Sequence, residues 1–168
     1  MRAPHPGVGI TALVALVLGA AACGPSIDLK QDLQVVDVTT GWFDAGIVSG
    51  GKNKLVPSIT FVLKNASDHK VNSVQLNLSF WRKGGDGEFD SAFLQTAINS
   101  TGLAPGAQSA PITLRGSVGY TGDVGLTRAE MLQHSAFVDA SARLTLKRGS
   151  SLWVQLGEFP IERRLLTR

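Results

Sequence analysis

The sequence predicts an all-β fold, an antiparallel β-sandwich of about six to eight strands with one short connecting helix. Apolar and polar residues alternate with a period of two over several short segments, which is the pattern of a strand with one buried face. Stretches rich in Gly, Pro, Ser and Asn separate these segments, as turns do. Only one segment carries the start signal of a helix. This combination favours a sandwich over a barrel or an α/β enzyme fold.

The clearest strand covers residues 74–81, with the sequence VQLNLSFW, and a second strand covers residues 58–65. The residues expected to face the core are Val74, Leu76, Leu78 and Phe80 in the first strand and Ile59, Phe61 and Leu63 in the second. Between the two, ASDHK at 66–70 has the composition of a polar turn that joins two antiparallel strands.

Two further strands are expected near the C-terminus, at 138–147 and 152–161, joined by a turn at RGSS. Their inward residues are expected to be Val138, Ala140, Ala142, Leu144 and Leu146, then Leu152, Val154 and Leu156. The inward phase then changes to Phe159 and Ile161. A change of phase at Gly157 predicts a β-bulge, and Pro160 indicates an edge strand or a strand end.

The remaining elements are less regular. Strands are expected at 33–40, 92–99 and 109–115, with a turn at Pro105 and Gly106. Thr127 and Glu130 have the spacing of a capping box, in which each side chain satisfies a backbone donor at the start of a helix. A helix of about two turns can follow it.

The N-terminus has the three parts of a secretory signal: a positive start, an apolar run and four small residues. The run ends in Ala20-Ala21-Ala22-Cys23 and resembles the lipobox of bacterial lipoproteins. The resemblance implies that Cys23 is acylated, with fatty acids such as palmitate, and becomes the first residue of the mature chain. Cys23 is the chain's one cysteine, so it has no intrachain disulfide partner. An ordinary cleaved signal peptide and an uncleaved anchor are the alternatives.

The expected organisation is a signal peptide at 1–22, the lipidated cysteine and a short tether at 23–31, and one β-sandwich domain at 32–168. Loss of the signal removes one positive charge, Arg2, and lowers the net charge from +3 to +2. Nucleic acid is therefore not an expected partner. The chain is expected to be held on a bilayer through Cys23. Gly24 is not the aspartate that resembles an inner-membrane retention signal, so the outer membrane, facing the periplasm, is expected in a Gram-negative cell.

Two longer stretches carry a second resemblance. The runs ITFVLKNASDHKVNSVQLNLSFWRKGG and LAPGAQSAPITL are similar to the immunoglobulin-like domains of bacterial envelope proteins of the FxLYD type. Leu78, Phe80 and Trp81 stand where that family has Phe, Leu and Tyr, while Arg82 replaces its Asp. The resemblance implies an immunoglobulin-like sandwich in an extracytoplasmic module. It carries over no catalytic residue.

The sequence contains no motif of a cofactor, metal or catalytic site, and we expect that the protein is not an enzyme. The histidines of the mature chain, His69 and His134, lack metal-ligand spacing. A triad of His134, Ser135 and Asp139 has no nucleophile motif around the serine. The acidic loop has Asp86, Glu88 and Asp90 at the spacing of calcium ligands, but Ser91 replaces the required glycine and Ala97 the final Glu.

Three aromatic residues form the candidate interaction surface: Trp81, Trp153 and Phe137, all on the outward phase of their strands. The alternative is that a loop or helix covers these aromatic residues. The basic end, with Arg163, Arg164 and Arg168, is expected to be a solvated tail, with binding to anionic lipid head groups as the alternative. We therefore expect a non-catalytic envelope lipoprotein that contacts another envelope protein or has a structural role. A module that binds a small molecule or glycan is the alternative.

Overall fold

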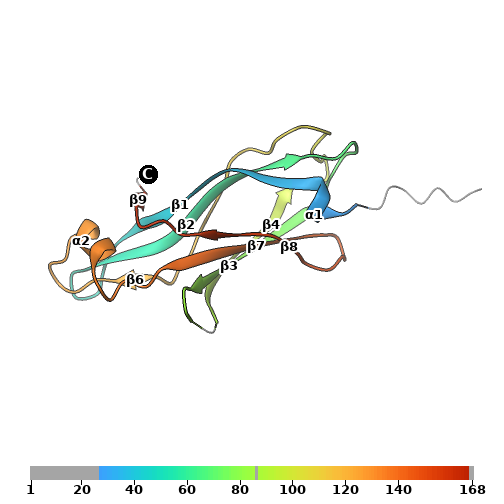
Figure 1. Ribbon diagram of the computed structural model, residues 1–168. Helices are drawn as coiled ribbons and strands as arrows, with labels where there is room; N and C mark the ends of the chain where they lie inside the picture. The colour runs from blue at the N-terminus through green and yellow to red at the C-terminus, as the bar shows by residue number, and fades with distance from the viewer. Residues whose placement is uncertain (1–26, 86, 167–168) are drawn as a thin grey trace, which may run out of the picture.

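Two antiparallel sheets stack face to face in the computed structural model, which describes residues 27–85 and 87–166 (Figure 1). The first sheet has the order β5 (Ile112–Arg115), β2 (Lys52–Asn65), β1 (Leu33–Val48) and β9 (Leu165–Leu166), and β6 (Tyr120–Thr121) also pairs with β2. The second sheet has the order β4 (Glu88–Ile98), β3 (Val74–Arg82), β7 (Ala140–Arg148) and β8 (Val154–Pro160). The predicted all-β sandwich is confirmed.

The order of seven of the strands resembles that of an immunoglobulin-like domain. β1, β2 and β5 take the places of strands A, B and E, and β3, β4, β7 and β8 take those of C, C′, F and G. The described residues form nine strands, more than expected, because β6 and β9 each add a two-residue strand. β9 pairs with β1 in parallel, an exception to the otherwise antiparallel sheets.

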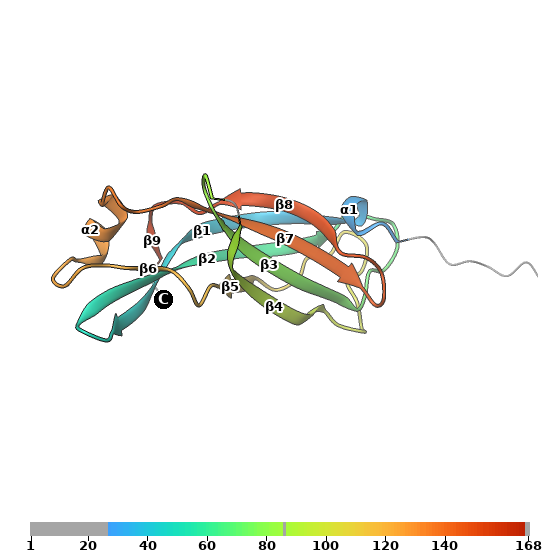
Figure 2. The ribbon, with the colours of Figure 1, turned by 90° about the horizontal axis from the view of Figure 1, so that it is seen from below.

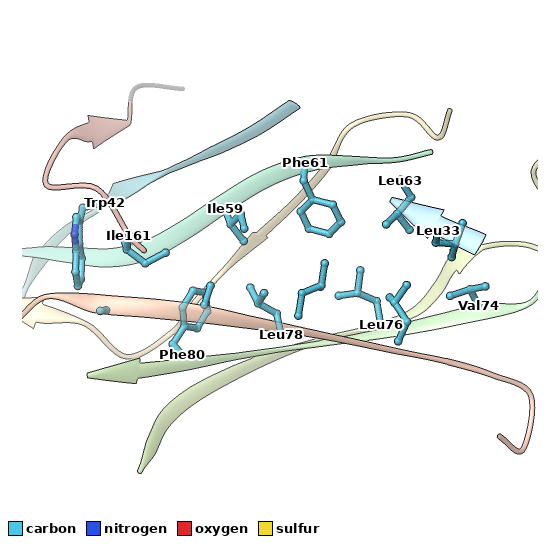
Figure 3. Packing of buried hydrophobic residues seen from close by; sticks show 14 of the residues in the cluster. Leu33, Trp42, Ile59, Phe61, Leu63, Val74, Leu76, Leu78, Phe80 and Ile161 are labelled. Carbon is cyan, nitrogen blue, oxygen red and sulfur yellow. The ribbon is translucent and has the colours of Figure 1, made fainter. Parts of the chain in front are cut away.

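The core lies between the sheets, where the predicted inward rows of β2 and β3 meet (Figure 3). The side chains without solvent exposure include Ile59, Phe61, Leu63, Val74, Leu76, Leu78, Phe80, Ala142, Leu144 and Leu146. Leu78 pairs with Leu144, and Leu76 pairs with Leu146, so β3 and β7 present their apolar residues at the same level. The predicted registers of these strands are confirmed, since each buries the residues assigned to its inward face.

Both C-terminal strands are shorter than the sequence pattern predicts. β7 begins at Ala140, and Val138, expected inside, is 48% exposed because it precedes the paired strand. β8 begins at Val154, its last pairing at this end is with Leu146, and Leu152 lies beyond the sandwich with 87% exposure. The predicted bulge is confirmed, because Leu144 pairs with Gly157 while the next residue of β7 already pairs with Gln155.

The connection at 66–70 is not the hairpin turn that was expected. β2 and β3 lie in different sheets, so this segment crosses between them. Asn65, fully buried at the end of β2, holds the crossing: its amide donates 2.8 Å hydrogen bonds to the carbonyls of His69 and Leu103, and its oxygen accepts from the Ser67 N–H. A buried amide with these partners is satisfied, which fixes the crossing in one conformation.

Two short helices lie at opposite ends of the sandwich (Figure 2). α2 (Arg128–Gln133) begins with the predicted capping box of Thr127 and Glu130. α1 (Leu29–Asp32) was not predicted and is capped by the Asp28 carboxylate. Leu29 is buried in the core cluster, so α1, whose residues 29–31 were assigned to the tether, belongs to the domain.

Replacement of Leu78 tests this register. Leu78→Ala removes a fully buried side chain from the middle of β3, and we expect a loss of about 2–5 kcal/mol in unfolding free energy. The neighbouring Asn77 faces outward and is half-buried, so Asn77→Ala is the matched control and should cost far less. Chemical denaturation of both variants measures the difference. Equal small losses would contradict the register.

Candidate interaction surface

The outer face of the four-stranded sheet, the side turned away from β1, β2 and β5, carries a pair of exposed aromatic residues. Phe93 on β4 and Trp153, just before β8, lie edge to face with ring centroids 6.2 Å apart. The Lys147 ammonium lies 5.0 Å from the Trp153 ring. Phe93 is 53% exposed and Trp153 is 43% exposed, so no segment that the structure describes encloses the pair. Large aromatic groups left in contact with water are typical of binding surfaces.

A second cluster, formed by Trp81, Arg143 and Glu158, lies at the other end of the same face. The Arg143 guanidinium stacks 3.9 Å from the Trp81 ring and donates a 2.9 Å hydrogen bond from Nε to Glu158. The Ser141 hydroxyl donates to the other carboxylate oxygen at 2.6 Å. The Trp81 indole N–H donates to Ser79 at 2.9 Å. Trp81 is therefore half-buried under a neighbouring side chain and is only partly available for binding.

Hydrogen bonds stabilise the negative charge of Glu158 in this cluster. The Ser141 hydroxyl and then the Arg143 guanidinium lower the pKa of Glu158 below its usual value of 4.5, because both stabilise the ionised carboxylate. Trp81, Arg143 and Glu158, with Lys83 beside them, line an open depression of about 520 Å³. It lies next to the turn between β3 and β4.

Phe137, the third predicted member of the surface, is buried. Its ring lies edge to face with Trp42, at 4.7 Å between centroids, and 5.1 Å from the Tyr120 ring. Only 3% of the residue is exposed. The prediction extended the alternation of β7 back to a segment that is not a strand, since β7 begins at Ala140.

Phe93 takes the place of Phe137 on the surface. The sequence did not single it out because apolar neighbours at 92 and 94 blur the alternation, and only its pairing with outward-facing Asn77 reveals its side.

The two histidines, and the aspartate of the rejected triad, have partners within the fold. His134 ends α2, where its Nδ1 lies 3.3 Å from the Tyr120 hydroxyl and 3.2 Å from the Ala136 N–H. The Asp139 carboxylate accepts a 2.6 Å hydrogen bond from Arg163, which lowers the pKa of Asp139. His69 lies in the crossing after β2, with its Nε2 3.1 Å from the Asp32 carboxylate.

One residue of the acidic loop, Asp90, joins two segments of the fold, which the sequence did not indicate. The Asp90 carboxylate accepts hydrogen bonds from the N–H groups of Ser117 and Val118, the latter at 2.7 Å, and so joins β4 to the segment between β5 and β6. Glu88 starts β4, and Asp86 lies outside the described residues. Within the described part of the chain, no group of acidic, His or Cys side chains is placed to hold a metal ion.

The basic end was expected to be a solvated tail; Arg163 and Arg164 are exposed, but hydrogen bonds hold them to the fold. The Arg164 carbonyl accepts a hydrogen bond from the Trp42 N–H, and its side chain donates to the Thr40 carbonyl at 2.7 Å. Arg163 binds Asp139 and the carbonyls of Leu132 and Phe137. These bonds fasten the segment before β9 to β1 and to the region around α2. Arg168 lies outside the described residues.

Cys23, the predicted lipidation site, also lies outside the described residues. Over residues 27–85 and 87–166, no helix has the length and apolar character required to cross a bilayer.

Comparison of the chain with family models and with curated proteins finds no match. Among solved structures, the X-ray structure of Northeast Structural Genomics Consortium target SoR45 is similar at 12% sequence identity, with a TM-score of 0.44. The similarity covers 80% of this chain and 89% of that chain. The β-sandwich fold follows from the strand order and core described above.

Acid titration tests the second cluster. The pKa of Glu158 is lowered in the folded protein, so its stabilising contribution is present above pH 4.5 and is lost as the pH falls through the lowered value. Because Arg143 stacks on Trp81, we expect tryptophan emission to change over the same range. In Glu158→Gln this transition should disappear while other carboxylates still titrate. Identical emission curves for the two proteins would contradict the coupling.

Proposed function

We propose that the protein is a membrane-anchored extracytoplasmic lipoprotein that acts as a non-catalytic interaction module. Cys23 carries the acyl groups, and the outer face of the four-stranded sheet binds a protein of the same cell envelope. The observation that carries the second half of this proposal is the exposed pair of Phe93 and Trp153. The pair gives a binding partner an exposed apolar area at one end of the face, opposite the cluster of Trp81, Arg143 and Glu158.

The composition of this face supports a protein partner. Aromatic residues and Arg are enriched at protein interfaces, where they supply most of the binding energy. Trp153 and Phe93 are such residues, and the stacked Arg143 and Trp81 extend the surface along the strands. β4 and β8 form the two edges of the sheet, so a partner can also contact backbone groups there.

The anchor is supported by the N-terminal sequence. A lone cysteine directly after an apolar run and three alanines has the placement of a lipidation site. Two or three acyl chains give a stable attachment, because each buried methylene contributes about 0.8 kcal/mol.

A glycan or small molecule is the second candidate ligand. The depression of about 520 Å³ beside Trp81 favours it, since one aromatic ring and paired polar groups line a volume of drug size. A ligand that binds the folded state raises the melting temperature of the purified protein, whereas a protein partner is found by crosslinking in intact envelopes.

Substitution of Cys23 tests the anchor. In a bacterial host, Cys23→Ala should move the protein from the membrane fraction to the soluble fraction or leave it unprocessed, because the site of acylation is lost. Incorporation of labelled fatty acid into the wild type is the direct measurement. If the wild type takes up no label and both proteins fractionate alike, the anchor proposal is wrong.

Site-specific photo-crosslinking tests the outer face. A crosslinking residue at Gln95, two positions along β4 from Phe93, should capture the partner in intact envelopes. Adding Phe93→Ala should lower the yield by about tenfold or more, the loss expected for a central aromatic of an interface. Val124 lies between β6 and α2 and is 71% exposed, so Val124→Ala is the matched control and should not change the yield. An equal effect of both substitutions would exclude the outer face as the binding surface.

A further inference from the structure

The first described residues and the turn between β7 and β8 lie at the same end of the sandwich. α1 contacts both β7 and β8, and the two views place α1 and this turn at the same end of the molecule, opposite α2 (Figures 1 and 2). Ile27 packs against the core cluster next to α1. The point at which the chain enters the domain is therefore fixed at this end.

The turn between β7 and β8 presents a large apolar side chain to solvent. Leu152 is 87% exposed, the largest value among the exposed large hydrophobic residues that the structure describes. Trp153 follows it, and Lys147 and Arg148 precede the turn. An exposed aliphatic side chain beside basic residues is suited to a membrane interface, where cations lie at head-group level.

The turn is held in place by hydrogen bonds. The Ser151 N–H donates to the Arg148 carbonyl, and the Arg148 N–H donates to the Ser151 hydroxyl, both at 3.0 Å. The Arg148 guanidinium donates to the Asn72 side chain at 2.8 Å, which joins the turn to the segment before β3. Leu152 is therefore presented by an ordered support, and little additional ordering is needed for it to meet a surface.

The length of the chain before the domain places a bilayer at this end. Cys23 precedes Ile27 by four residues, and a fully extended chain spans at most about 3.6 Å per residue, or about 14 Å here. If Cys23 is lipidated, as proposed above, its Cα atom cannot lie farther than this from that of Ile27, the first packed residue. The lipid head groups must then be close to α1 and to the adjacent turn.

We propose that the turn between β7 and β8 is a second membrane contact of the protein. Leu152 enters the interfacial region of the bilayer that holds the acyl groups, and Lys147 lies near the lipid phosphates. This inference rests on the proposed lipid anchor. It goes beyond that anchor because it orients the domain: the strands run away from the membrane, and α2 lies at the far end.

An environment-sensitive fluorophore tests this contact in the full-length lipidated protein. Leu152→Cys supplies a thiol for labelling after purification, since Cys23 is already acylated. The labelled protein is reconstituted in vesicles of phosphatidylethanolamine and phosphatidylglycerol. Ile47 is 70% exposed on β1, close to the turn that joins β1 to β2 at the end opposite α1, so Ile47→Cys is the matched control.

Three outcomes decide the proposal. A probe at 152 whose emission shifts to shorter wavelength, and which a nitroxide-bearing lipid quenches severalfold more than the probe at 47, supports the contact. Flotation of the protein with vesicles but equal, weak quenching at both positions overturns the contact and leaves the anchor standing. A wild type that does not float with the vesicles shows that the anchor is absent, and the inference falls with it.

Discussion

The packing of one row of side chains on β3 against the opposite sheet determines most of what the rest of the molecule does. Val74, Leu76, Leu78 and Phe80 have no solvent exposure, and the matching row on β7 pairs with them. Because successive side chains of a strand point to opposite faces, burial of these positions directs the residues between them outward. Trp81, Arg143 and Lys147 are therefore on the outer face as a consequence of the core register, and any slip by one residue would bury them.

A few polar groups then fix how the two sheets are connected. Asn65 binds carbonyls from two connections at the α1 end, while Asp90 binds two backbone N–H groups between β5 and β6. Each carries hydrogen bonds between segments that are distant in sequence, so neither has a local signature. The apolar core supplies most of the stability, and these groups select one arrangement of the loops. The effect is strongest at the fully buried Asn65, because an unsatisfied buried amide costs about 1–3 kcal/mol.

Local patterns predicted the strands that have one buried face, and they failed where a contact depends on distant segments. The alternation in β2, β3 and β7, the bulge at Gly157 and the capping box at Thr127 each involve neighbouring residues, and all were predictable. Phe137 and Leu152 were misplaced because alternation does not show where pairing stops. The crossing after β2 resembled a hairpin turn, because composition reports that the chain turns but not which strand it pairs with next. Phe93 lies on an edge strand, where only the register with β3 distinguishes the two faces.

The two ends of the sandwich differ in a way that links the anchor to the interaction surface. At the α2 end, Arg163 and Arg164 are committed to hydrogen bonds within the fold, which leaves them poorly suited to lipid phosphates. At the α1 end, Leu152 extends from an ordered turn close to the entry of the chain. Two contacts with a bilayer restrict rotation of the domain about a single tether. The outer face with Phe93 and Trp153 would then be held at a defined height and direction, so a partner anchored in the same envelope would lose less orientational freedom on binding. On this view the short tether has a purpose of its own: a longer one would keep the protein on the membrane but would release the orientation of the face.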